Sequence, residues 1–222
     1  MNTVAINLLQ GRLSPVHLTS RLAGRQAAVS LVAVSVILSV DHYHAFAEAP
    51  VVKEACLYLL LPLAIVVLLF RQSPLHYGLG LGRWREGLAW TAGGVLLMLG
   101  VAWLFLRLPE FPAFYEGYFA ARNPGGQFWT GTILTGLQMF SWEFLFRGFL
   151  LFALAEQFGS QAILIQTVPF ALAHFGKPEW ETYSSIAGGA LSGWIAYRVR
   201  SFYPSWIIHW ALAFGMSWLL GG

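Results

Sequence analysis

Four residues that can carry charge or exchange protons interrupt the long apolar runs in the second half of the sequence. Glu143 and Arg147 stand four residues apart, so on a helix they share one face and can pair, which makes their burial tolerable. His174 and His209 each lie in a later apolar stretch. A carboxylate and two imidazoles supply a base that activates water and groups that hold an oxyanion. The chemistry that this set predicts is hydrolysis of a peptide bond within a membrane.

The same residues also form a donor set for zinc, a His2Glu site. The sequence contains no His-Glu-x-x-His motif, and ligands scattered over three segments are weak evidence for a metal. A cation at Glu143 would meet repulsion from the Arg147 guanidinium and would compete for the same carboxylate oxygens. We therefore predict no metal and no cofactor, and we keep a metalloprotease as an alternative.

Helices of bilayer length must position these residues. The chain of 222 residues is 57% hydrophobic and 10% charged, whereas a globular protein is about 25% charged. The apolar stretches predict an all-α, polytopic transmembrane bundle with about seven spans, at residues 27–46, 55–70, 86–106, 130–157, 161–175, 183–199 and 203–220. The longest connection, 107–129, contains Pro and Gly residues that are expected to interrupt regular structure.

Basic residues indicate the orientation of the bundle. With a cytoplasmic N-terminus, Arg residues gather on the cytoplasmic side, as the positive-inside rule requires. The cytoplasmic set is Arg12, Arg21, Arg25, Arg71, Arg83, Arg85, Arg198 and Arg200, and the opposite set is Lys53, Arg107, Arg122 and Lys177. The net charge of +3 is spread over several loops, which excludes nucleic acid as the expected partner. We predict a multi-pass cell-membrane protein with a cytoplasmic N-terminal segment at 1–26 and one bundle in the lipid bilayer at 27–222.

Three motifs, by their order and spacing, resemble the core of the CPBP family, which includes CAAX proteases and bacteriocin-processing enzymes. The motifs are Glu143-x-x-x-Arg147-Gly148, Phe170-x-x-x-His174, and His209 after Pro204-Ser205-Trp206. The resemblance covers about residues 78–218 and includes the turn Leu79-Gly80-Leu81-Gly82. It implies an all-helical intramembrane endopeptidase of the glutamate type, in which the Glu of the first motif activates water. The two His of such enzymes orient that water or stabilise the oxyanion.

Two positions depart from the family pattern. The first motif usually opens with paired glutamates, the first being the usual base, but here Trp142 stands before Glu143. The third motif usually places Asn or Asp four residues after its His, but here Ala213 stands there. Glu143 must therefore be both the base and the partner of Arg147, or the chain has no base. These departures keep open a second hypothesis, a non-proteolytic membrane scaffold or an immunity-type binding protein.

The sequence thus predicts an endopeptidase that cleaves a hydrophobic or membrane-anchored protein substrate. Glu143, His174 and His209 are the predicted catalytic residues, and Arg147 supports Glu143. By the predicted spans, His174 lies near the outer end of its helix and His209 nearer the inner end of another. Either the span boundaries differ from these, or the helices are tilted or broken there. A transporter is disfavoured because the sequence shows no inverted symmetry of broken hydrophobic segments.

Overall fold

The computed structural model describes residues 15–44, 50–122 and 125–221, and all regular structure in these ranges is helical. The first half comprises α2 (Pro15–Tyr43), the stretch α3 (Pro50–Glu54), η1 (Ala55–Leu60), α4 (Leu61–Ala64) and η2 (Ile65–Leu69), then η3 (Pro74–Tyr77), α5 (Trp84–Phe105) and α6 (Glu110–Arg122). The second half comprises α7 (Phe128–Glu143), η4 (Phe144–Leu150), α8 (Leu151–Phe158), η5 (Gly159–Gln161), α9 (Ala162–Leu172), α10 (Glu179–Val199) and α11 (Tyr203–Leu219).

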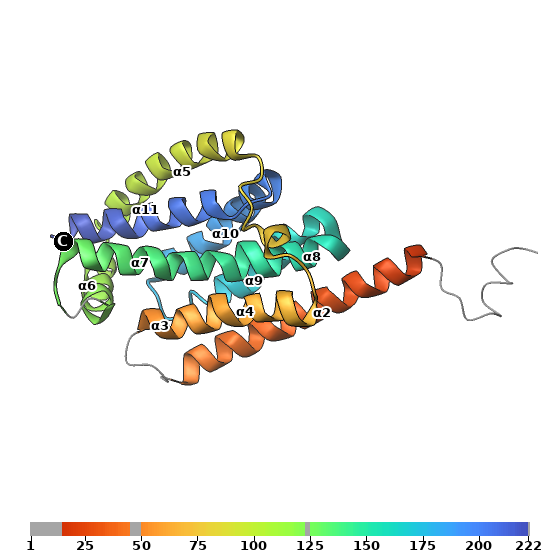
Figure 1. Cartoon of the computed structure of the whole chain (residues 1–222). Coiled ribbons are helices and arrows are strands. Elements are labelled where there is room, and N and C mark those ends of the chain that lie inside the picture. The colour runs from red at the N-terminus through yellow and green to blue at the C-terminus, as the bar shows by residue number, and fades with distance from the viewer. Residues whose placement is uncertain (1–14, 45–49, 123–124, 222) are drawn as a thin grey trace, which may run out of the picture.

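Helix α7 and its continuation form the centre of the bundle. In Figure 1, α11 and α5 lie on one side of α7, and α3 and α4 lie on the other side. The first part of this continuation, Phe144–Leu154, is apolar apart from Arg147, and every residue in it is buried. A helix that is apolar all round belongs in the interior. The segment that carries Glu143 and Arg147 is therefore the core of the protein.

Four helical stretches of the described residues are long and apolar enough to cross a membrane: Leu22–Tyr43, Pro50–Leu69, Trp84–Phe105 and Phe128–Leu172. This is the pattern of a multi-pass membrane protein. The expected spans at 183–199 and 203–220 correspond to α10 and α11, which are helical but are not among these four. Helix α10 begins with Glu179 and Glu181, and α11 has only 17 residues.

Two helices extend beyond the regions that hydropathy delimits. Helix α2 begins at Pro15, inside the predicted N-terminal segment 1–26, and its first turns project beyond the neighbouring helices (Figure 1). Residues 1–14 of that segment lie outside the described residues. The connection 107–129, which was expected to lack regular structure, contains α6. Pro112 does not disrupt this helix because it lies in the first turn, where its missing N–H costs no hydrogen bond.

Candidate active site

Glu143 and Arg147 meet where α7 passes into the wider, π-helical turn η4. Nη1 of Arg147 lies 3.0 Å from Oε1 of Glu143, and the two side chains are 0% and 1% exposed. The remaining guanidinium nitrogens, Nε and Nη2, have no hydrogen-bond partner among the described residues. Instead the guanidinium lies over the Phe170 ring, with Cζ 3.7 Å from the ring centroid.

His209 approaches the same carboxylate from α11. Its Nδ1 lies 2.7 Å from Oε1 of Glu143. An ionised carboxylate only accepts hydrogen bonds, so Nδ1 carries a proton. Two tryptophans of α11 fix this face of the helix on α7: Trp206 Nε1 donates to the Gly136 carbonyl at 2.8 Å, and Trp210 Nε1 donates to the Thr132 carbonyl at 3.0 Å.

His174 lies in the turn that follows α9. Its Nδ1 is 2.8 Å from the Phe170 carbonyl, which also only accepts, so in the neutral ring Nε2 carries the lone pair. The Phe170 ring packs against both imidazoles, with centroids 4.5 Å from His174 and 6.4 Å from His209. Because the same ring lies under Arg147, Phe170 connects the polar residues of three helical segments.

Glu143, His174 and His209 line one cavity of about 290 Å³. Most of its remaining wall is apolar and comes from α5, α10 and α11. A carboxylate held by two donors, together with two imidazoles held through Nδ1, can bind water and exchange protons with it. The arrangement is therefore suited to acid and base chemistry beside an apolar chain.

The depth mismatch that the predicted spans imply is absent because α9 is short. It has 11 residues, with Pro169 inside it, and it ends at Leu172. His174 is therefore placed by a turn, whose main chain is held by the Thr182 hydroxyl donating to the His174 carbonyl. His209 lies on the second turn of α11 and reaches the same cavity.

Trp142, which stands at the family's usual first glutamate, packs outside the cavity lining. Its ring contacts Tyr58 and His174 edge-on, with centroid distances of 5.4 Å and 5.8 Å. Its buried indole Nε1 has no hydrogen-bond partner in the part of the chain that the structure describes. Trp142 thus supports the back of the His174 ring and offers no proton acceptor.

A second carboxylate, Glu181 of α10, also lines the cavity and was not singled out from the sequence. It is buried and accepts hydrogen bonds from the Tyr115 hydroxyl at 2.5 Å and from the Lys177 ammonium at 2.9 Å. Tyr115 belongs to α6, so this bond ties the connection between α5 and α7 to α10. In the sequence Glu181 stands beside Glu179 in a charged turn, and nothing in that pattern distinguishes a buried carboxylate from an exposed one.

Residues 124–215 match the family model described as type II CAAX prenyl endopeptidase Rce1-like. The match contains all three motifs and runs from the start of α7 into α11. The predicted resemblance to the CPBP family is confirmed for this region, and the family indicates a protease. No match was found among the curated proteins or among the solved structures.

Proposed function

We propose that the chain, with its Rce1-like region at 124–215, is an intramembrane endopeptidase that hydrolyses a peptide bond in or near a hydrophobic segment of a client protein. The observation that carries this proposal is the convergence of Glu143, His174 and His209 on one largely apolar cavity. Burying three polar side chains from three helical segments in apolar surroundings costs free energy, and apolar residues would fill the same volume at a lower cost. Packing alone therefore does not account for these residues.

Glu143 is the proposed base. Its Oε1 already accepts hydrogen bonds from Arg147 and His209, whereas Oε2 has no partner among the described residues. A water molecule attacks the carbonyl carbon of the scissile bond, and its proton passes to Oε2. The C–N bond of the tetrahedral intermediate then breaks, and Glu143 returns the proton to the leaving nitrogen.

The two histidines have different proposed roles because their hydrogen-bond partners differ. His174, held by a carbonyl, keeps a lone pair on Nε2 that accepts a hydrogen bond from the attacking water and orients it. His209 is held through Nδ1 by the Glu143 carboxylate. In the proposed mechanism the ring carries a proton on each nitrogen throughout, and Nε2–H donates to the oxyanion. Arg147 keeps Glu143 ionised and fixes its rotamer.

The apolar walls of the cavity supply the proposed substrate channel. Helix α5 contributes Gly94, Leu97, Met98, Val101 and Phe105, and α10 contributes Ala187, Gly188, Leu191 and Ile195. An apolar segment of a client gains burial in such a channel, whereas a polar segment would lose its hydration. The proposed substrate is therefore a hydrophobic or membrane-anchored protein. No described side chain selects a particular lipid modification.

Replacing Gly188 by Leu should block this channel. A Cβ at Gly188 meets no atom within 4 Å, so the larger side chain enters the cavity without displacing the helix. We expect cleavage to fall by about tenfold or more while the melting temperature is unchanged, because even small misplacement of a substrate is costly. The matched control is Gly93→Leu on α5, which is equally open but lies outside the cavity lining. Equal activity of both variants would exclude a channel along α10.

The topology that we propose has seven spans and a cytoplasmic N-terminus. It places Gly82 and Gly125 on opposite sides of the membrane, because one span, α5, and the α6 connection separate them. Reporter fusions after these two residues should give opposite signals with a cytoplasmic and an external reporter. If both report the same side, the assignment of α5 as a full span is wrong.

A second candidate function is a non-proteolytic scaffold or immunity-type binding protein. Trp142 favours it, since this residue replaces a carboxylate of the family pattern with a side chain that offers no proton acceptor. The two functions differ in one observable, since only the endopeptidase generates new chain termini in a client.

A further inference from the structure

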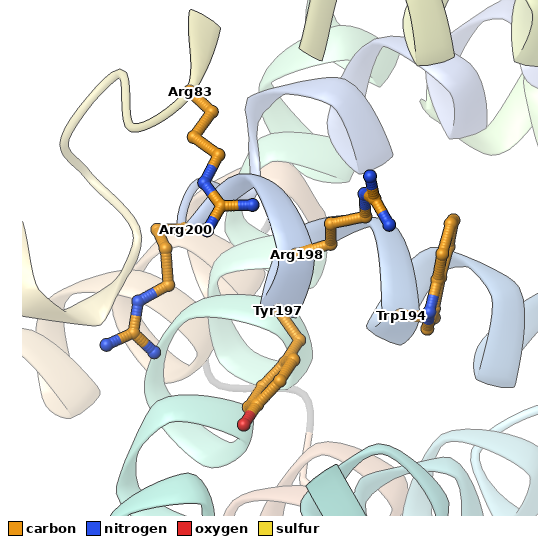
Figure 2. Close-up of a pocket in the computed structure, with 5 residues that line it drawn as sticks. All are labelled: Arg83, Trp194, Tyr197, Arg198 and Arg200. Atoms are coloured by element: carbon orange, nitrogen blue, oxygen red, sulfur yellow. The ribbon is translucent and has the colours of Figure 1, made fainter. Parts of the chain in front are cut away.

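A second pocket, here called the arginine pocket, lies at the C-terminal end of α10 beside the turn that precedes α5. It is lined by Arg83, Trp194, Tyr197, Arg198 and Arg200 and has a volume of about 520 Å³. Figure 2 shows the three arginines near the C-terminal end of α10, the helix that also supplies Tyr197 and Trp194. None of these residues lines the catalytic cavity, so the arginine pocket is a separate feature of the protein.

The main chain builds the pocket by joining two distant segments. The Arg83 amide donates to the Val199 carbonyl at 2.8 Å. Gly82 permits this approach, because a Cβ there would lie 2.1 Å from the same carbonyl oxygen, and its φ of +53° is unfavourable for other residues. Arg200 itself adopts a left-handed conformation, with a φ of 62°, at the end of α10. A non-glycine residue in this conformation costs free energy, so the backbone conformation at Arg200 is imposed by the fold.

The pocket carries an excess of positive charge. Glu86 forms ion pairs with both Arg83 and Arg198. Arg198 also lies over the Trp194 ring, with Cζ 5.4 Å from the centroid. Arg200 makes no ion pair within the described residues and lies 5.8 Å from the Phe152 ring centroid. Glu86 thus pairs with two of the three guanidinium groups, and the charge that it does not balance, including that of Arg200, is available to an anion.

We propose that the arginine pocket binds the phosphate of an anionic phospholipid headgroup. Guanidinium groups present paired N–H donors that match phosphate oxygens. The pocket adjoins Arg83, the residue directly before α5, and α5 is one of the helices able to cross a membrane. The ends of such helices lie at headgroup level, where Trp and Tyr also gather. Basic pockets between helices at this level suit anionic lipid headgroups, which favours a lipid over a soluble phosphate.

The test is lipid retention by the purified full-length protein, measured by native mass spectrometry after exchange into phosphatidylglycerol or phosphatidylcholine. The variant is Arg83→Gln combined with Arg200→Asn, because Asn tolerates the left-handed backbone at position 200. Each arginine removed should weaken binding of phosphatidylglycerol about fivefold, so the double variant should bind roughly 25-fold more weakly. Phosphatidylcholine binding should be unchanged. Arg107→Gln, which removes an arginine stacked on Trp103 at the other end of α5, is the matched control and should retain the anionic lipid.

Two results would overturn the proposal. One is retention of phosphatidylglycerol by the double variant at the wild-type level. The other is inorganic phosphate binding to lipid-free wild-type protein as tightly as phosphatidylglycerol does, which would make the pocket a site for soluble phosphate. If the double variant does not fold, Arg200→Asn alone should still bind about fivefold more weakly than wild type. Catalysis enters neither the proposal nor the test, so the outcome is independent of the proposed function.

Discussion

Replacing Glu143 by Gln should abolish client cleavage while leaving the protein folded. The amide keeps the shape of the carboxylate and can still accept hydrogen bonds from Arg147 and His209 through its oxygen. It cannot take a proton from water, so the step that depends on the base is lost. The measurements are cleavage in proteoliposomes and the melting temperature in detergent.

Glu181→Gln is the matched control for this prediction, because Glu181 is a second buried carboxylate in the same cavity. Its oxygens are held by Tyr115 and Lys177, and neither imidazole is hydrogen-bonded to it. We expect Glu181→Gln to retain cleavage. If Glu181→Gln abolished cleavage and Glu143→Gln did not, the base would be Glu181 and the proposed mechanism would be wrong.

Replacing Arg147 by Leu should destabilise the protein as well as inactivate it. The substitution leaves the Glu143 carboxylate buried without its cation, and breaking a buried pair in this way costs roughly 3–5 kcal/mol. The loss of contact with the Phe170 ring adds to this cost. Thermal unfolding in detergent, with Arg107→Leu as the surface control, measures the effect.

The double substitution Glu143→Leu with Arg147→Leu separates two contributions to stability, that of the unpaired buried charge and that of the lost side-chain contacts. Removing both partners leaves no unpaired charge in the core, so stability should return toward the wild-type value although cleavage remains absent. An Arg147→Leu protein as stable as wild type would mean that the Glu143 charge is balanced by another group. The supporting role that we give to Arg147 would then be wrong.

The sequence predicted the local part of this site because helical geometry fixes it. Two residues four apart on a helix meet whatever the rest of the chain does, so the pairing of Glu143 with Arg147 follows from spacing alone. The helical class followed similarly from the length of the apolar stretches. The contact between Glu143 and His209 spans 66 residues, and only the order of the family motifs linked the two in advance.

The parts that sequence reasoning missed depend on tertiary packing. Hydropathy delimits the apolar region of a helix and not its end, so it placed His174 inside the span predicted at 161–175, whereas α9 ends at Leu172. Hydropathy also does not reveal α6, because its Pro112 reads as a break until its first-turn position is known. The burial of Glu181 arises from Tyr115 of that helix, a contact between segments 66 residues apart.

The most direct test of the central claim compares the new chain termini of membrane proteins in cells that express the wild-type protein with those in cells that express Glu143→Gln. Wild-type protein and Glu143→Gln are expressed at equal levels in the same host in water enriched in oxygen-18, and the termini of membrane proteins are then identified by mass spectrometry. The proposal predicts wild-type-specific cleavage in or next to apolar segments, with one heavy oxygen in each new carboxylate because water supplies it. An identical set of termini in both membranes would contradict the endopeptidase and favour the non-proteolytic scaffold.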